Sequence, residues 1–197
     1  MNDSVVDAAL TIWTIGHSTR SIEEFTRSLA PVAIDLLVDI RSIPRSRTNP
    51  QFNREALPIA LAATGVGYRH LPELGGLRGP RKDGAGSPNT LWRSGAFRNY
   101  ADYAAANPAF RLGLGELQAL ARDRRHIAIM CAEAVWWRCH RRIVADYLLV
   151  AGFAVHHILG VNQIERASLT PGAKPQADGA ILYSAPEEAQ LSLFSLL

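Results

Sequence analysis

The sequence has few cysteines and few lysines: Cys131 and Cys139 are its two cysteines, and Lys82 and Lys174 are its two lysines. Two cysteines are too few to cross-link an extracellular scaffold, so we expect free thiols or metal ligands in a reducing compartment. The chain lacks an apolar run of about 18 residues, which argues against a membrane-spanning helix. Its N-terminus has no basic cluster and no small-residue cleavage signal, which argues against a secretory leader. These absences predict a cytoplasmic protein.

Positive charge comes almost entirely from arginine. The 21 basic residues exceed the 18 acidic ones for a net charge of +3, and 48% of the residues are apolar, enough for the core of one domain. A guanidinium fork suits phosphate and carboxylate recognition, although a GC-rich genome produces the same preference for arginine. The mildly basic balance therefore permits contact with nucleic acid without requiring it.

Short apolar runs of β type alternate with helical patterns along the chain, which is typical of parallel βαβ units. Ser21 and Glu24 have the spacing of a capping box at the start of the first helix. The pattern predicts a single Rossmann-like α/β domain over residues 11–160, with a mostly parallel sheet flanked by helices. The expected strands are 10–16, 35–41, one beginning at 67, 126–133 and 154–159; the expected helices are 21–32, 54–65, 97–105, 109–123 and 138–152.

Polar and reactive residues follow four of the expected strands. Ligands of such sheets bind in the crevice beyond the carboxyl ends of the strands. Each residue alone is explained as a turn or cap residue, but their convergence predicts a site. The residues are Gly16, His17, Ser18 and Thr19; Arg41 and Ser42; Glu73, Gly75 and Gly76; and Cys131 and Glu133. The glycine- and proline-rich segment 75–89 is long enough to predict a functional or mobile loop beside them.

The densest patch is "MCAEAVWWRCHRR", residues 130–142. Cys139 and His140 are expected in the first turn of the helix that follows, where free N–H groups and the helix dipole favour anions and thiolates. Cys139 is thus a candidate nucleophile, and Glu133 a candidate general acid or base, working with Glu73. The flanking positive charges come from Arg138, Arg141 and Arg142.

Two other interpretations of this patch stay open. The first is a metal site, although the C-x7-C-H spacing is not a standard zinc pattern. Its candidate ligands are Cys131, Cys139, His140 and His17. In the second, both cysteines are small buried hydrophobic residues, and Arg138 or Arg141 pairs with Glu133 to fix the strand to the helix.

The segment 89–103, "NTLWRSGAFRNYADY", interleaves arginines with aromatic rings. This combination stacks bases and holds phosphates in proteins that bind single strands. The spacing of Phe97, Tyr100 and Tyr103 instead favours one apolar face of a helix. Trp92 and Arg93 precede that helix beside the long loop, and we predict that they contact a ligand.

Several motifs in order resemble the domain of unknown function 488 family: "TIGHS", "LVDIRSIPRS", "YRHLPELGG", "LWRSGAFRNYADYA", "IAIMCAEAVWWRCHRRIVADYLL" and "VHHI". The resemblance covers residues 11–160 and implies a Rossmann-like domain without an established reaction. One departure is Leu77 between Gly76 and Arg78, which leaves the role of Arg78 open. The resemblance supports a site of His17, Ser18, Arg41, Glu73, Cys131, Glu133, Cys139, His140 and Arg141.

Residues 161–197 are expected to form an extended C-terminal tail. Its segment 190–194, "QLSLF", is similar to the peptide by which bacterial replication and repair proteins bind the sliding clamp. Such a peptide needs an amide anchor, apolar anchors and a flexible tether, here 168–179. The expected anchors are Gln190, Leu191, Leu193 and Phe194. Alternatively the tail packs on the core, as 180–184 would.

These observations predict an enzyme-like protein of DNA maintenance that the clamp recruits to a nucleotide or nucleic-acid substrate. Base excision or phosphodiester hydrolysis suits the site, with Glu133 moving protons and Cys139 and His140 supplying reactivity or metal ligation. The anion would be bound by Arg41, Arg138 and Arg141. The alternatives are a non-catalytic adaptor for DNA and clamp, whose cysteines are structural, and a small-molecule or metal-dependent enzyme.

Overall fold

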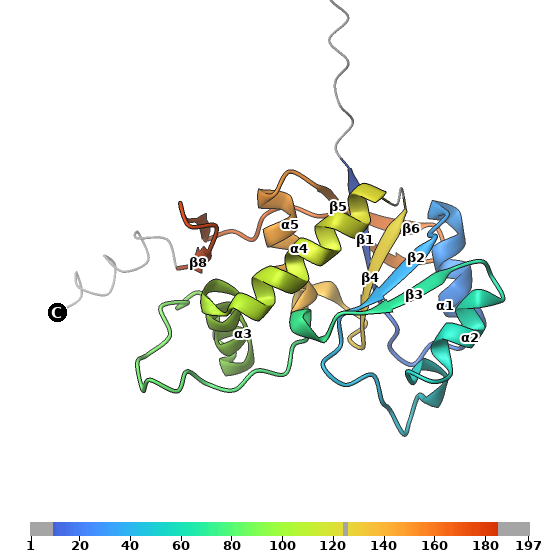
Figure 1. Ribbon diagram of the computed structural model, residues 1–197, viewed down its shortest axis with the longest axis horizontal. Helices are drawn as coiled ribbons and strands as arrows, with labels where there is room; N and C mark the ends of the chain where they lie inside the picture. Colours follow the sequence, from blue (N-terminus) through green and yellow to red (C-terminus); the bar gives the residue numbers. More distant parts are fainter. Residues whose placement is uncertain (1–9, 124–125, 185–197) are drawn as a thin grey trace, which may run out of the picture.

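The computed structural model describes residues 10–123 and 126–184 (Figure 1). Its strands are β1 (Thr11–Gly16), β2 (Leu36–Asp39), β3 (Gly67–His70), β4 (Ile127–Cys131), β5 (Ala154–Gly160), β6 (Gln163–Arg166), β7 (Ala173–Pro175) and β8 (Ile181–Tyr183). Its α-helices are α1 (Ile22–Leu29), α2 (Leu57–Ala62), α3 (Gly95–Ala106), α4 (Pro108–Asp123) and α5 (Arg141–Val150). None of the described helices is both long and apolar enough to cross a membrane.

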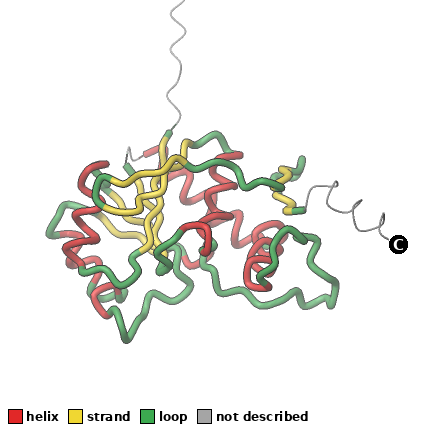
Figure 2. The backbone as a smooth tube through the Cα atoms, turned by 180° about the vertical axis from the view of Figure 1, so that it is seen from behind, coloured by secondary structure: helices red, strands yellow, loops and turns green. Residues whose placement is uncertain are grey.

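The main sheet has the strand order β3-β2-β4-β1-β5-β6. Its first five strands are parallel, and β6 pairs antiparallel with β5. Helices α1 and α2 cover one face, and α3, α4 and α5 lie on the other (Figures 1 and 2). The predicted Rossmann-like α/β architecture is therefore confirmed.

The central strand β4 shows why this layering forms. All five of its residues are buried, as expected of a strand covered on both faces. Because successive side chains point to opposite faces, Ile127 and Ile129 join the core under α3, α4 and α5, whereas Ala128 and Met130 join the core under α1 and α2. One strand thus connects two separate apolar cores.

The predicted capping box starts α1. The Ser21 hydroxyl accepts a hydrogen bond from the Glu24 N–H at 3.1 Å, and the Glu24 carboxylate accepts one from the Ser21 N–H at 3.0 Å. These bonds satisfy two N–H groups that the helix leaves without internal partners. The helix therefore begins at Ile22, directly after the loop that carries His17 and Ser18.

The described part of the C-terminal region differs from the expected extended tail. Strand β6 belongs to the main sheet, and β7 and β8 form a hairpin at the end of the molecule away from α1 and α2 (Figure 2). Ile181 and Tyr183 are fully buried in the core under α3 and α5. The expected tether 168–179 therefore contains β7 and the turn of this hairpin, and segment 180–184, which carries β8, packs on the core, as the alternative interpretation expected of that segment. The clamp-binding segment 190–194 lies outside the described residues.

Long-range hydrogen bonds hold the hairpin. The Tyr183 hydroxyl donates to the Asp146 carboxylate at 2.9 Å, and the Tyr183 N–H donates to the Asn89 side-chain oxygen at 2.9 Å. The Asp146 carboxylate also accepts from the Thr170 N–H at 2.8 Å. Partners this distant in sequence explain why the local composition of this segment, rich in proline and glycine, did not predict the hairpin.

Candidate functional site

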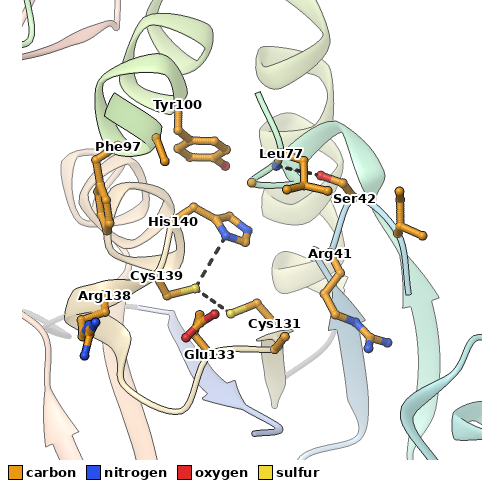
Figure 3. Close-up of a pocket in the computed structure, with 14 residues that line it drawn as sticks. Arg41, Ser42, Leu77, Phe97, Tyr100, Cys131, Glu133, Arg138, Cys139 and His140 are labelled. Carbon is orange, nitrogen blue, oxygen red and sulfur yellow. Dashed lines mark hydrogen bonds between the residues drawn. The ribbon is translucent and has the colours of Figure 1, made fainter. Parts of the chain in front are cut away.

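A cavity of about 330 Å3 opens beyond the carboxyl ends of β2 and β4, beside the first turn of α3 (Figure 3). Its mouth and walls include the apolar side chains Ile43, Leu77, Phe97 and Tyr100. This is the crevice where the fold class binds its ligands, because β2 and β4 lead to helices on opposite faces of the sheet. The predicted site residues that line it are Arg41, Ser42, Gly76, Cys131, Glu133, Arg138, Cys139 and His140.

Two thiols lie together in the wall of this cavity. Cys131 is the last residue of β4, and Cys139 follows the 3-10 turn Trp136–Arg138. Their Sγ atoms are hydrogen-bonded at 2.6 Å, and each residue is 2% exposed. The structure therefore brings both predicted cysteines to one point.

The two thiols differ in acidity. Burial raises the pKa of Cys131 well above its ordinary value, and its hydrogen bond to Cys139 adds to that effect. Burial opposes ionisation of Cys139 too, but the hydrogen bond from Cys131 and the charges of His140 and Arg141 bring the pKa of Cys139 well below its ordinary value. These opposite shifts favour ionisation of Cys139 over Cys131, so Cys131 is assigned as the donor in the hydrogen bond between them.

His140 faces the Cys139 sulfur. Its Nε2 lies 3.1 Å from the Ile40 carbonyl oxygen, which only accepts, so Nε2 carries a proton. Its Nδ1 lies 3.6 Å from the Cys139 sulfur. The ring is packed closely by Gly76, where an added β-carbon would lie 2.5 Å from Nδ1. The loop after β3 thus fixes the imidazole against the sulfur.

The expected position of Cys139 and His140 inside the first helical turn is wrong by one to two residues. Helix α5 begins at Arg141, and His140 is its N-cap residue. The Arg141 N–H donates to the Cys139 sulfur at 3.5 Å. Although Cys139 lies outside α5, the N-terminus of this helix therefore stabilises a thiolate at Cys139 through the Arg141 N–H.

Arg141 is a structural cation and not the anion ligand that the sequence predicted. It is 1% exposed, and its guanidinium donates to the backbone carbonyl oxygen of Glu133 at 2.8 Å. It therefore fixes the loop after β4 and places positive charge near both sulfurs. The ion pair that was considered between Arg141 and the Glu133 carboxylate does not form.

Arg41 is likewise occupied. Its guanidinium forms a buried ion pair with Asp39 at 2.6 Å and donates to the Phe52 carbonyl oxygen at 2.7 Å. In Figure 3 this guanidinium points away from the sulfurs. The charge of Arg41 is thus balanced inside the protein, whereas the Arg138 guanidinium has no hydrogen-bond or ionic partner among the described residues. Arg138 is the arginine that this cavity offers to an anion.

His17 and Ser18 line a second, more polar cavity of about 390 Å3. The His17 Nδ1–H donates to the Ser18 carbonyl oxygen at 2.8 Å, and Nε2 accepts from Arg41 at 3.1 Å. Burial lowers the pKa of His17 to about 4, so the ring is neutral. The exposed Glu133 lines both cavities and therefore stands between them.

The second cavity includes residues that the sequence analysis did not select, namely Arg45, Ser46 and Asn49. They lie in the loop after β2, where the motif "IPRS" provided a signal that could have found them. A mixture of guanidinium, hydroxyl and amide groups suits a sugar or phosphate. The adjoining apolar cavity suits a flat ring.

Several predicted residues do not line these cavities, among them Glu73, Trp92, Arg93 and the buried Arg141 described above. Glu73 lies in the 3-10 turn Pro72–Leu74, where its carbonyl oxygen accepts a hydrogen bond from the Tyr103 hydroxyl at 2.7 Å. Trp92 is 8% exposed and packs against Phe97 and Tyr183 in the core. Arg93 is exposed. Trp92 is thus a core residue, and Glu73 does not line either cavity that Glu133 lines.

The predicted metal ligands are partly gathered. One ligand atom from each of Cys131, Cys139 and His140 lies within 4.8 Å of the others. Two sulfurs and an imidazole nitrogen are donors that suit zinc and other thiophilic ions. His17 is not part of this group, because its ring faces Arg41.

A family model described as "Domain of unknown function DUF488" matches residues 21–148, more than half of the chain. The protein belongs to the DUF488 family. No curated protein and no solved structure matches it. The matched segment contains both cysteines, Glu133, His140 and Arg141, so the thiol cluster of this DUF488 protein lies within the part that defines the family.

Proposed function

We propose that this DUF488 protein is an enzyme of DNA maintenance that acts on a nucleotide or nucleic-acid substrate, with Cys139 as its nucleophile. The observation that carries the proposal is the position of the Cys139 sulfur, held by Cys131, His140 and the Arg141 N–H in the wall of an open cavity. A thiolate supported by an imidazole and by the start of a helix is an activated nucleophile.

The neighbouring groups suit a displacement in two steps. The Cys139 thiolate attacks the reacting carbon or phosphorus atom, and the leaving group takes a proton from His140. Glu133, exposed at the junction of the two cavities, then accepts a proton from the water that hydrolyses the covalent intermediate. Arg138 binds the anionic part of the substrate. Base excision and phosphodiester hydrolysis both fit this scheme.

The two adjoining cavities differ in polarity, which supports a substrate that has one apolar end and one polar end. Phe97, Tyr100 and Leu77 offer apolar surface to a flat base, and the hydroxyl and guanidinium groups of Ser18, Ser46 and Arg45 offer polar partners to sugar and phosphate. Nucleotide units combine these two properties, and aromatic and arginine side chains bind them in this way.

The experiment is a turnover assay on oligonucleotides with damaged or modified bases and on free nucleotides. We expect Cys139→Ser to lose turnover and Glu133→Gln to lower kcat by about 100-fold or more, with both variants remaining folded. Arg27→Ala, an exposed change on α1 outside both cavities, is the control and should keep its activity. Full turnover by Cys139→Ser would contradict the proposal, and loss of stability in Glu133→Gln would favour the adaptor with structural cysteines.

We further propose that Gln190, Leu191, Leu193 and Phe194 bind the bacterial sliding clamp. The support is the sequence similarity of 190–194 to clamp-binding peptides. The full-length protein should bind purified clamp with micromolar or tighter affinity, and the Leu193→Ala, Phe194→Ala double variant should not. A Leu196→Ala, Leu197→Ala variant changes the same tail outside the motif and should bind normally. Absence of binding by the intact protein would contradict this part of the proposal.

A metal-dependent enzyme is the second candidate, because the ligand atoms of Cys131, Cys139 and His140 lie close together. Metal analysis of freshly purified protein tests it. Near-stoichiometric zinc or another thiophilic metal, lost in Cys139→Ser, would favour this candidate over the free nucleophile. Full metal content in Cys139→Ser would exclude Cys139 as a ligand.

A further inference from the structure

We infer that Cys131 and Cys139 form a dithiol–disulfide couple that exchanges with small aliphatic disulfides, with Cys139 as the attacking thiol and Cys131 as the resolving thiol. The inference goes beyond the proposed function, which uses Cys139 alone and gives Cys131 no chemical role. It shares the reactivity of Cys139 with that function but does not depend on a nucleic-acid substrate.

The first support is the contact between the sulfurs. They are 2.6 Å apart and belong to different elements, the end of β4 and the residue after the 3-10 turn Trp136–Arg138. The loop between them is fixed by the Arg141 guanidinium, which donates to the Glu133 carbonyl oxygen. Two sulfurs that are already in contact can form a bond with little further approach.

The second support is the asymmetry of the pair. Cys139 accepts a hydrogen bond from the Arg141 N–H at 3.5 Å and faces the His140 Nδ1 at 3.6 Å. Both groups stabilise negative charge on that sulfur. Cys131 lies at the end of the central strand, within reach of Cys139. The geometry therefore assigns attack to Cys139 and resolution to Cys131.

The third support is access. Both cysteines line the cavity, although each residue is 2% exposed, so a small molecule reaches them only by entering it. The mouth carries the exposed apolar side chains of Ile43 and Leu77. A volume of about 330 Å3 with apolar walls suits a small aliphatic disulfide and excludes a folded protein.

The exchange proceeds in two steps. Cys139 gives its proton to Nδ1 of His140, the Cys139 thiolate attacks one sulfur of R–S–S–R, the S–S bond breaks, and the departing RS⁻ takes the proton from Nδ1. The neutral imidazole then accepts the Cys131 proton, the Cys131 sulfur attacks the Cys139 sulfur, and the mixed disulfide breaks. The second RS⁻ takes that proton. The net change is oxidation of the two thiols to one disulfide and reduction of R–S–S–R to two RSH.

The test uses reduced full-length protein and bis(2-hydroxyethyl) disulfide, followed by acid quenching and intact mass measurement. Because the chain has two cysteines, the assignment of the product is unambiguous. The wild type should lose two hydrogens without keeping an adduct, and dithiothreitol should reverse the change. Cys131→Ala and Cys131→Ser should instead accumulate a mixed disulfide on Cys139, and Cys139→Ser should react at least about tenfold more slowly.

Two outcomes would overturn the couple: a wild-type protein that accumulates the mixed disulfide while Cys131 stays free, or one that stays fully reduced. Alkylation by iodoacetamide in parallel separates this failure from that of the proposed function. If Cys139 is alkylated rapidly but no disulfide forms, the dithiol–disulfide couple is refuted and the assignment of Cys139 as a nucleophile stands. Disulfide closure in a protein that turns over no nucleotide or oligonucleotide supports the couple and counts against the proposed substrate. The second Cys131 variant guards against a buried substitution that prevents folding.

Discussion

Gly76 controls the orientation of His140 by having no side chain. An added β-carbon would lie 2.5 Å from Nδ1 and 2.8 Å from Cγ of that ring, so the imidazole would have to move from the Cys139 sulfur. Gly79 lies in the same loop, and its added β-carbon would have no heavy atom within 4 Å. The two glycines therefore form a matched pair for testing the position of the imidazole.

We expect Gly76→Ala to slow alkylation of Cys139 by iodoacetamide about tenfold at pH 7, because displacement of the ring removes its support for the thiolate. Gly79→Ala should react at the wild-type rate. Rates are measured by mass spectrometry on proteins whose circular dichroism shows that they are folded. Equal rates for both variants would show that His140 does not activate the thiol.

At this scale the sequence predicted part of the site. The rule that ligands bind beyond strand ends selected Cys131 and Glu133, and the expected start of the next helix selected Cys139 and His140, because both rules depend on backbone positions. Glu73 does not line the cavities, since the 3-10 turn after β3 places its Cβ beside Gly113 of α4, 2.7 Å from where a β-carbon of that residue would lie. The sequence also could not show which guanidinium groups have partners inside the protein and which can bind a ligand. The partners that occupy them are buried carbonyl and carboxylate oxygens, which become known only when the chain is folded.

A buried hydroxyl is one of the groups that join the β7–β8 hairpin to the core. Tyr183 donates to Asp146, whose carboxylate also receives the Thr170 N–H, and burial raises the pKa of that carboxyl group. The segment from Thr170 to Tyr183 is therefore joined to α5 by a largely buried polar group.

Tyr183→Phe should lower the free energy of unfolding by about 1 to 3 kcal/mol, because the buried carboxylate loses a donor. Leu112→Ala, on a side chain that is 74% exposed, should change it by less than about 0.5 kcal/mol. Urea denaturation of both variants makes the comparison. A Tyr183→Phe variant as stable as the wild type would mean that water satisfies Asp146 and that the hairpin is held by apolar contacts.

Elements with strong local patterns were predicted well, and the reasons are local. The capping box set the start of α1, and runs of buried β-type residues set β1, β4 and β5. The hairpin was missed because its proline and glycine residues also fit a tether. Its partners Asn89 and Asp146 are distant in sequence, so no window of local sequence contains the interaction.

Stability of the whole molecule should depend on neutral buried histidines. Burial lowers the pKa of His17 and of His157 to about 4, and the nearby charge of Arg141 also lowers that of His157. The ordinary value in an unfolded chain is about 6.5. Between these values the unfolded chain binds more protons, so their contribution is full above pH 6.5 and is lost as the pH falls toward 4.

From pH 7 to pH 5, we expect each of these histidines to reduce the free energy of unfolding by about 2 kcal/mol. His157→Gln should show a shallower loss over this range, whatever its stability at pH 7. The measurement is urea denaturation at several pH values. An unchanged pH dependence in the variant would show that His157 does not carry this effect.

The overall architecture followed from the sequence, but the order of the strands did not. Alternation of β-type and helical segments predicted a parallel sheet. The insertion of β4 between β1 and β2 depends on which helices cover which face. That insertion matters for the site, because it places Cys131 in the wall of the first cavity and Glu133 between the two cavities.

The central claim is that Cys139 is an activated nucleophile in the folded protein. The most direct test is the rate of alkylation of each cysteine by iodoacetamide between pH 5 and pH 9, with the modified residue located by mass spectrometry. We predict rapid modification of Cys139 with a midpoint well below the ordinary thiol value of about 8.5, while Cys131 stays unmodified until the protein unfolds. A Cys139 that reacts only on unfolding, or with a midpoint at or above that value, would contradict the account.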